Sequence, residues 1–538
     1  MIAATATLLH DKRLRVSRGT AVPQELSESG GTAACSTVLI VGAGPAGLFA
    51  ACELLRHGVS PRVVERRFGP HHEARGTALQ PATLEIIDRA GLIEPFLHSG
   101  VHIRQVQLLG PGLQEITTTK FAGIGCKYEF QCSLPQWRTE TILRDHLQSL
   151  GVKIEYGTEV KSVEDGPNGL VVTLEPSGGT ERLTAAYVLG AGGAHSITRH
   201  SMHEHLDGET YDGRFIVADA KARLPCPPEC GRVIVGPTGF ALFSPLPDNR
   251  WLIFVNRNET DTRPELPTAG AIGTLLNARV GVDISLHDVR WVSYFKMHKR
   301  AAKRLTDGRR FLLGDAAHLS SPLGGEGLNS AFMDAADIAW KLALVIRRSA
   351  RRTLLDSYAA ERWIADHHVL EVSDEVHGFV MNLIAMCDSG GAPSAPPTDP
   401  IEAVAAARRR SMLDISYVGS ALVGQAGAMV DGPSTGARFP ACHRLSGTRH
   451  HLIVPSEAPR IDHFRERWDK LVSVIDASQF YATSAGVYNG AAVLVRPDGF
   501  VGFRADPTDE QTMNALDAHL ATYLIPDAGA APLRRGFT

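Results

Sequence analysis

The first regular hydrophobic pattern of the chain predicts a strand, a helix and a second strand. Residues 37–41 form a continuous apolar run that ends at a glycine, as in a parallel strand buried on both faces. Apolar residues then recur at helical spacing up to Gly58, and residues 61–65 resemble a second strand. Three such elements within about thirty residues predict a right-handed βαβ unit.

The hydrophobic pattern changes further along the chain. Residues 214–256 contain short apolar runs separated by prolines and glycines, which predicts a mostly antiparallel sheet. A buried strand returns at residue 310 and leads through a glycine-rich turn into a long helix over 329–347. The proline-rich stretch 389–400 predicts a linker, and the strands and helix expected beyond it indicate a third domain.

Composition and charge narrow the classes of protein to consider. The chain has 538 residues, of which 44% are hydrophobic and 21% charged, with a net charge of −3. This balance gives no field that would recruit nucleic acid or an anionic membrane, so neither partner is expected. No apolar run reaches the roughly 18 to 20 residues of a membrane span. Cys226 and Cys230 have no matching ligand pair, so no metal is expected, and the eight scattered cysteines favour reduced thiols and a cytoplasmic location.

A glycine motif lies at the turn of the βαβ unit. In GAGPAG, Gly42 permits the tight turn, Gly44 leaves room for a pyrophosphate, and Gly47 lets the helix pack closely. Pro45 and Ala46 open the helix, whose N-terminus attracts phosphate. Glu65, at the end of the second strand, can accept hydrogen bonds from both ribose hydroxyls and would repel a 2′-phosphate. The motif alone does not decide whether the ligand is FAD or NAD, and a glycine turn without any ligand is a further alternative.

A second motif follows the strand near residue 310. Asp315 comes after Gly314 at the carboxyl end of this strand, where ligands bind in open α/β sheets. The next loop lets backbone approach a flat ring, and the helix after it could place its positive end near reduced flavin. The alternative is an N-cap aspartate with a glycine loop. The loop and helix residues expected at the cofactor are Gly324, Gly325, Gly327, Leu328 and Asn329.

Together, GAGPAG with Glu65 and GDAAHLSSPLGGEGLNSAFMDAADIAWKLA resemble the single-component (class A) FAD-dependent aromatic hydroxylases. These are the p-hydroxybenzoate hydroxylase-like enzymes, which include polyketide and phenol hydroxylases. The resemblance covers about residues 37–380. It implies bound FAD, contacted also by Arg75 in EARG, by Gln136 in LPQ and by Arg66 beside Glu65. The chain after residue 408 resembles the thioredoxin-like domain of larger members, without a CxxC pair, which favours a structural or dimerisation role.

The expected fold is therefore α/β. A Rossmann-like FAD-binding domain contains an inserted, mostly antiparallel substrate-binding sheet and is followed by a thioredoxin-like α/β domain. We expect a disordered tail over 1–35, the FAD-binding domain over 36–213 and 301–400, the substrate-binding sheet over 214–300 with a segment of about 100–133, and the third domain over 408–538.

One motif departs from the family pattern. Where the family has GADGARSxVR, this chain has Gly192 in place of the aspartate and His195 in place of the first arginine, while Arg199 remains. The loss of a carboxylate is expected to weaken NAD(P)H docking or to change how reduction is gated. Glu326 in place of glutamine and Leu323 in place of threonine are milder changes.

The resemblance implies a monooxygenase that uses NAD(P)H and O₂. A flavin C4a-hydroperoxide would hydroxylate a phenolic or polycyclic aromatic compound, as in the tailoring of natural products such as antibiotics. Pro322 is expected beside the reactive face of the flavin, and His298 is expected to accept a phenolic proton. Aromatic residues of the middle sheet are the expected pocket walls: Phe240, Phe243, Trp251, Phe254 and Tyr294.

Three alternatives stay open at the level of sequence. The same scaffold could epoxidise an alkene or insert oxygen in a Baeyer–Villiger reaction, because this chemistry belongs to the cofactor. Alternatively, weak reduction of the flavin would leave a flavin-binding protein that is not an oxygenase. In every case the expected partner is a small aromatic molecule, and the assembly we consider beside the monomer is a homodimer.

Overall fold

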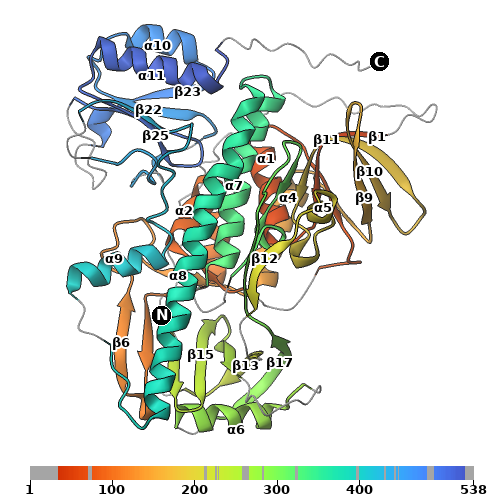
Figure 1. Ribbon diagram of the computed structural model, residues 1–538, viewed down its shortest axis with the longest axis vertical. Helices are drawn as coiled ribbons and strands as arrows, with labels where there is room; N and C mark the ends of the chain where they lie inside the picture. The colour runs from red at the N-terminus through yellow and green to blue at the C-terminus, as the bar shows by residue number, and fades with distance from the viewer. Residues whose placement is uncertain are drawn as a thin grey trace, which may run out of the picture.

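The protein has an α/β fold, which confirms the predicted class (Figure 1). The computed structural model describes residues 34–70, 76–210, 215–224, 227, 229–256, 266–281, 284–320, 325–395, 399–428, 432–440, 444–445, 447–480 and 490–526. Most of the predicted tail lies outside these residues, although its last two residues already belong to the first strand, β1 (Ala34–Val41). Among the described helices, none has a long enough apolar stretch to cross a bilayer.

The first sheet has the order β8-β2-β1-β11-β10-β9, with β19 paired to β11. Strands β1, β2, β11 and β19 run parallel to one another, so their carboxyl ends share one edge. Alternate residues of β1 pack into different hydrophobic clusters, as predicted for a strand covered on both faces. The other strands are β2 (Arg62–Glu65), β8 (Ile154–Tyr156), β9 (Glu159–Gly166), β10 (Gly169–Glu175), β11 (Glu181–Gly190) and β19 (Arg310–Leu312).

Two helices from distant parts of the chain pack together beside this sheet. They are α1 (Pro45–Arg56), which follows β1, and α7 (Gly327–Ile346), which begins close to the predicted position. Phe49 of α1 contacts Phe332 of α7, with ring centroids 4.6 Å apart. The smaller helices of this domain are α2 (Pro81–Arg89), α3 (Ile93–Ser99), α4 (Gln136–Ser149) and α5 (Ile197–Ser201).

The middle sheet lies at the opposite end of the molecule from the last domain (Figure 1). Its order is β17-β13-β16-β15-β14-β5-β6, so the segment near residues 100–133 does contribute strands. Helix α6 (Ala269–Val280) packs on one face and the far end of α8 (Asp356–Asp388) on the other. The strands are β5 (Gln105–Leu109), β6 (Glu115–Lys120), β13 (Phe215–Ala222), β14 (Cys230–Gly236), β15 (Gly239–Leu246), β16 (Arg250–Asn256) and β17 (Leu286–Phe295).

Two three-stranded sheets lie between these larger units. One has the order β3-β7-β4 and the other β12-β18-β20. Their strands are β3 (Ala78–Leu79), β4 (Val101–Ile103), β7 (Gln131–Ser133), β12 (Leu206–Thr210), β18 (His298–Ala302) and β20 (His318–Leu319).

The C-terminal domain has a five-stranded mixed sheet of order β21-β25-β24-β22-β23. A parallel β22-α10-β23 unit is followed by the predicted hairpin and helix, while the finer thioredoxin-like assignment stays a prediction. Residues 412–417 pack in the core of the first domain, so this domain's own sheet begins later than the expected boundary. The elements are α9 (Pro400–Arg410), β21 (Gly424–Gly427), β22 (His450–Val454), α10 (Ile461–Trp468), β23 (Val472–Asp476), β24 (Ala492–Val495), β25 (Val501–Asp506) and α11 (Glu510–Tyr523).

Candidate flavin site

The loops that follow β1, β11 and β19 meet at the carboxyl edge of the first sheet. Gly42, after β1, has a φ of +111°, and a Cβ there would lie 2.3 Å from the carbonyl oxygen of Ala191. A Cβ at Gly47 would lie 2.0 Å from the carbonyl oxygen of Gly42. Both glycines are therefore required by protein packing alone, whatever the loop binds.

Gly44 is different, because nothing in the protein requires a glycine there. Its φ is −80°, and a Cβ at this position would have no heavy atom within 4 Å. It directly precedes α1, whose N-terminus has no side-chain cap. Open space beside unpaired N–H groups at a helix start is where a pyrophosphate would fit. Pro45, which has no N–H of its own, and Ala46 begin the first turn of α1 beside that space.

Glu65 lies at the same edge, at the end of β2, and is buried. Its Oε2 accepts a hydrogen bond from the Ala43 N–H at 2.8 Å, and its Oε1 accepts from the N–H and Nε of Arg67 at 3.0 Å. Burial raises the pKa of this carboxyl, but these hydrogen bonds outweigh burial and lower it overall. Glu65 is therefore a fixed anionic acceptor, and the neighbouring Arg66 is exposed.

The second motif touches the first. Gly314 follows β19, and a Cβ on it would lie 3.3 Å from the Cβ of Ala46 and 3.1 Å from that of Ala331. Gly314 donates its N–H to Asp334 at 2.8 Å, while the adjacent Asp315 is exposed. The turn after β19 thus lies against the first turn of α1. Two of the residues expected here, Pro322 and Gly324, lie outside the described part of the chain.

A third segment joins these two. The N–H of Gly76 donates to Gln136 Oε1 at 3.3 Å, and a Cβ at Gly76 would lie 3.3 Å from the Cβ of Leu328. Gln136 and Leu328 therefore lie at the same glycine, their contact with the cofactor stays a prediction, and Arg75 is not among the described residues. Gly325 shortly precedes α7, and Gly327 is the first residue of this helix.

The side chain of Asn329 has a structural role, and the expected contact of this residue with the cofactor stays a prediction. Its side-chain oxygen accepts from the N–H of Gln80 at 2.7 Å, and its amide nitrogen donates to Ala78 at 2.9 Å and to Gly325 at 2.6 Å. Because protein backbone uses both ends of this buried amide, Asn329 holds the loop against β3 rather than offering a free group to a ligand.

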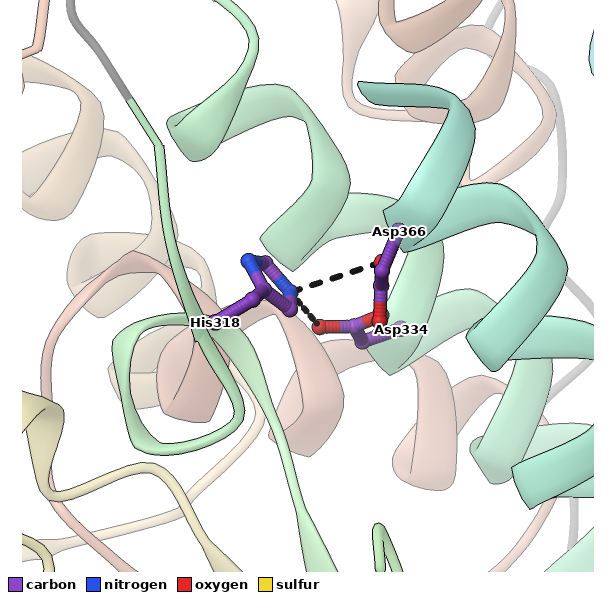
Figure 2. Close-up of side chains that lie close together, drawn as sticks. All are labelled: His318, Asp334 and Asp366. Atoms are coloured by element: carbon purple, nitrogen blue, oxygen red, sulfur yellow. Dashed lines mark hydrogen bonds and ion pairs between the residues drawn. The ribbon is translucent and has the colours of Figure 1, made fainter. Parts of the chain in front are cut away.

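A buried cluster of charges supports the turn after β19, and the sequence patterns did not single it out. Figure 2 shows His318 pointing at Asp334 of α7 and Asp366 of α8. Its Nε2 lies 3.0 Å from Asp334 and 3.6 Å from Asp366. Burial disfavours the imidazolium, but Asp366 and Asp334 outweigh it and raise the pKa of His318 to about 9. Asp334 therefore links this cation to the backbone of Gly314.

Arg362 completes this cluster. It donates from Nε to Asp334 at 2.6 Å and from Nη2 to Asp366 at 2.9 Å, and it also contacts Ser330 and Tyr417. The two carboxylates are thus neutralised by Arg362 and His318 together. The spacing of Arg362 and Asp366, four residues apart on a buried helix face, was the available sequence signal.

The loop after β11 contains the substituted motif. Gly192 has a φ of −78°, and the nearest atom to a Cβ there is Ser196 Cα at 3.6 Å, so a Cβ would make only ordinary contacts. His195 is exposed. Arg199 is buried and donates to the carbonyl oxygens of Ala194 at 2.6 Å and Ala316 at 3.2 Å. Arg199 therefore ties this loop to the turn after β19.

The five aromatic residues expected in the substrate pocket do not share one face of the middle sheet. Phe240 and Phe254 lie on the face that meets α8, whereas Phe243, Trp251 and Tyr294 pack on the α6 face. The physical reason is that successive side chains of a strand point to opposite faces. Ser244, on the same face as Phe240, lies within 3.5 Å of Thr77 and 3.3 Å of Ser133, which directs this face toward the FAD-binding domain.

His298 lies outside the middle sheet, in β18. Its Nδ1 is 2.9 Å from the hydroxyl of Thr210. Burial lowers the pKa of His298, and Arg300 and Lys296 lower it further. The neutral imidazole can accept a proton, and its role in catalysis stays a prediction.

Glu326 is a second buried acid that the sequence marked only as a mild change. Its side chain is 1% exposed, and neither carboxyl oxygen has a hydrogen-bond partner among the described residues. Burial raises the pKa of Glu326 to about 8, against the smaller opposing effects of its own backbone N–H and of the charge of Arg410. The folded protein therefore keeps this proton over a pH range in which the unfolded chain releases it.

We expect Glu326→Gln to stabilise the protein at neutral pH. The wild type should lose stability as the pH rises from about 4.5 to 8, because only the unfolded chain ionises this carboxyl there. Glutamine removes that cost, so the free energy of unfolding, measured with urea at pH 7, should rise by about 2 kcal/mol. Glu457→Gln, at an exposed turn, should change nothing. If the free energy of unfolding depends on pH equally in the wild type and in Glu326→Gln, this expectation is contradicted.

Comparisons with known proteins agree with this geometry. Residues 35–373 match the FAD binding domain family, and residues 422–525 match the aromatic-ring hydroxylase C-terminal family. A flavin-dependent monooxygenase of Mycobacteroides abscessus is 31% identical over 87% of this chain and 96% of its own length. A dialkyldecalin synthase of Streptomyces rugosporus is 28% identical over 91% of this chain and 99% of its own. The structure of aklavinone-11 hydroxylase with FAD and aklavinone is 25% identical, with a TM-score of 0.72, and covers 90% of this chain and 98% of that one.

Proposed function

Because the chain belongs to the family of FAD-dependent aromatic hydroxylases, we propose that it hydroxylates a phenolic or polycyclic aromatic compound with NAD(P)H and O₂. The observation that carries this proposal is the close approach of Gly314 to Ala46, which joins two motifs 268 residues apart at one sheet edge. An extended dinucleotide would contact both motifs at the same time. We also infer a role in natural-product tailoring, since one relative's solved structure contains aklavinone.

The residues present fit FAD. Gly44 leaves the space that a pyrophosphate needs, and Glu65 offers a charged acceptor for ribose. Asp315 would accept a hydrogen bond from the ribityl chain, and the backbone of Gly325, Gly327 and Leu328 would face the ring. When bound, the flavin supplies the redox and oxygen chemistry that side chains lack.

The chain's own task is to hold the aromatic substrate and exclude water. We propose that the substrate lies between the flavin and the face of the middle sheet that carries Phe254 and Ser244. His298 would accept the phenolic proton, because its lowered pKa leaves it neutral at pH 7. The residues of the α6 face, Phe243 and Trp251, would support this wall from behind.

The test is an assay of the FAD-loaded protein with NADPH or NADH against a panel of phenols and polycyclic quinones. A substrate should accelerate NAD(P)H consumption and yield a product with one added oxygen atom. A panel in which no compound does both would remove the support for aromatic hydroxylation. Product structure would also separate hydroxylation from epoxidation and Baeyer–Villiger insertion.

A second candidate is a flavin-binding protein that is not an oxygenase. Gly192 favours it, because the family's carboxylate is missing from the loop beside the nucleotide site. One full-length relative is also called a synthase rather than a monooxygenase. In that case FAD would be bound but reduced slowly, with or without an aromatic ligand.

We expect Gly192→Asp to speed reduction of the flavin by NADPH. The position has room for a side chain and ordinary backbone angles, so the variant should fold. One added charge-assisted hydrogen bond is worth about 1 kcal/mol, or roughly a fivefold faster reduction in stopped-flow measurements. Gly178→Asp, at an open position, is the matched control. Equal rates in Gly192→Asp and the wild type would show that the missing carboxylate does not limit reduction.

A further inference from the structure

A cavity of about 420 Å³ lies where the last turn of α7 meets the C-terminal domain. One side comes from α7 and the residues just after it, and the other from the starts of the neighbouring parallel strands β22 and β23. The contact between the two domains at this point is fixed by buried apolar residues, including Leu344 of α7 and Leu471 before β23. The cavity therefore lies beside a packed contact of the two domains, and Arg449 and Lys470 are among its exposed members.

The lining is rich in positive charge. Arg347, Arg449 and Lys470 all lie on it, and none of the described residues that line it is an aspartate or glutamate. Among the described residues, none of these three cations forms an ion pair, and the two arginines donate only to carbonyl oxygens: Arg347 to His57 at 2.9 Å and Arg449 to Asp469 at 2.8 Å. Their charge is therefore not neutralised by the protein.

Hydroxyl groups complete the lining. Ser349, Thr448 and Ser473 line the same cavity, and their side chains have no partner within the described part of the chain. Three cations and three hydroxyls form a set of donors that suits the oxygen atoms of a phosphate. The partial negative charge at the end of α7, about half a unit, is small beside three full charges.

This cavity is remote from the flavin site. Helix α7 has 20 residues and begins at the flavin site, so its other end lies about 30 Å away. A ligand bound there cannot exchange a hydride with the flavin. Because it would contact both domains, its binding should strengthen their association.

We propose that this cavity binds a phosphate group, either free phosphate or pyrophosphate or the phosphate of a nucleotide. The site takes no part in the flavin chemistry. Its ligand would connect the C-terminal domain to the end of α7. Arg449 and Lys470 recognise the anion from the C-terminal domain, and Arg347 recognises it from α7.

Isothermal titration of the FAD-loaded full-length protein, in buffer free of phosphate and sulfate, tests the site. Inorganic pyrophosphate should bind saturably, and the double variant Arg449→Glu/Lys470→Glu should bind it at least tenfold more weakly. Lys153→Glu, at an exposed position without an ion pair among the described residues, should bind as the wild type does. Flavin content and circular dichroism of each variant establish that it is folded.

Parallel titrations with phosphate, NADP⁺ and NAD⁺ identify the source. If the wild type binds a nucleotide but not free pyrophosphate, and the double variant loses this binding, the site takes the phosphate of a nucleotide. If the double variant loses the binding of pyrophosphate but of no nucleotide, the site takes the free anion. The proposal is overturned if no phosphate compound binds at millimolar concentration, or if the double variant binds all of them as the wild type does.

Discussion

Gly44→Ala should fold normally and bind FAD at least 100-fold more weakly, a loss of about 3 kcal/mol. Apart from its chain neighbours, no described residue has a heavy atom within 4 Å of the new methyl group, and the backbone angles suit alanine. Only a pyrophosphate approaching the start of α1 would collide with it. Quenching of flavin fluorescence during titration of the apoprotein measures the affinity, and urea unfolding of the apoprotein measures the stability.

Two matched variants make this result specific. Gly270→Ala, at another open glycine in α6, should bind FAD as the wild type does. Gly42→Ala should fail to fold stably, because its methyl group would collide with the carbonyl oxygen of Ala191. Wild-type FAD affinity in Gly44→Ala would place the cofactor elsewhere.

Arg362→Met should destabilise the protein by about 3–5 kcal/mol, because it leaves Asp334 and Asp366 buried without their guanidinium. Since Asp334 also accepts the Gly314 N–H, the variant should lose flavin as well. Unfolding by urea and the flavin content of the purified protein measure the two effects.

The comparison variant is Arg465→Met on α10, whose ion pair with Asp462 is exposed and should be worth under about 1 kcal/mol. Adding Asp366→Asn to Arg362→Met should recover part of the stability, because it removes one unpaired charge. If the free energies of unfolding of Arg362→Met and Arg465→Met differ by less than about 1 kcal/mol, the charge cluster does not support the turn after β19.

Local patterns predicted the parts of the fold that depend on neighbouring residues. Strand β1, helix α1 and the turn after β19 follow from hydrophobic periodicity and glycine spacing, and each lies where expected. The contact of Ala46 with Gly314 required the resemblance to a family, because no local rule joins segments so far apart.

The sequence could not assign the expected pocket residues to one face of the middle sheet, for a different reason. Aromatic residues mark a buried sheet, but the face on which each one lies depends on strand register, which places Phe254 and Trp251 on opposite sides. The His318 cluster was missed because its members come from three separate elements. Nothing in the sequence alone indicates that Asn329 uses both ends of its amide on backbone.

The absorption spectrum of the recombinant protein, after incubation with FAD and desalting, tests the central claim most directly. The joined motifs at the edge of the first sheet predict one tightly held FAD for each chain. A colourless protein that retains no flavin would contradict a flavin site at this edge and the oxygenation proposed from it.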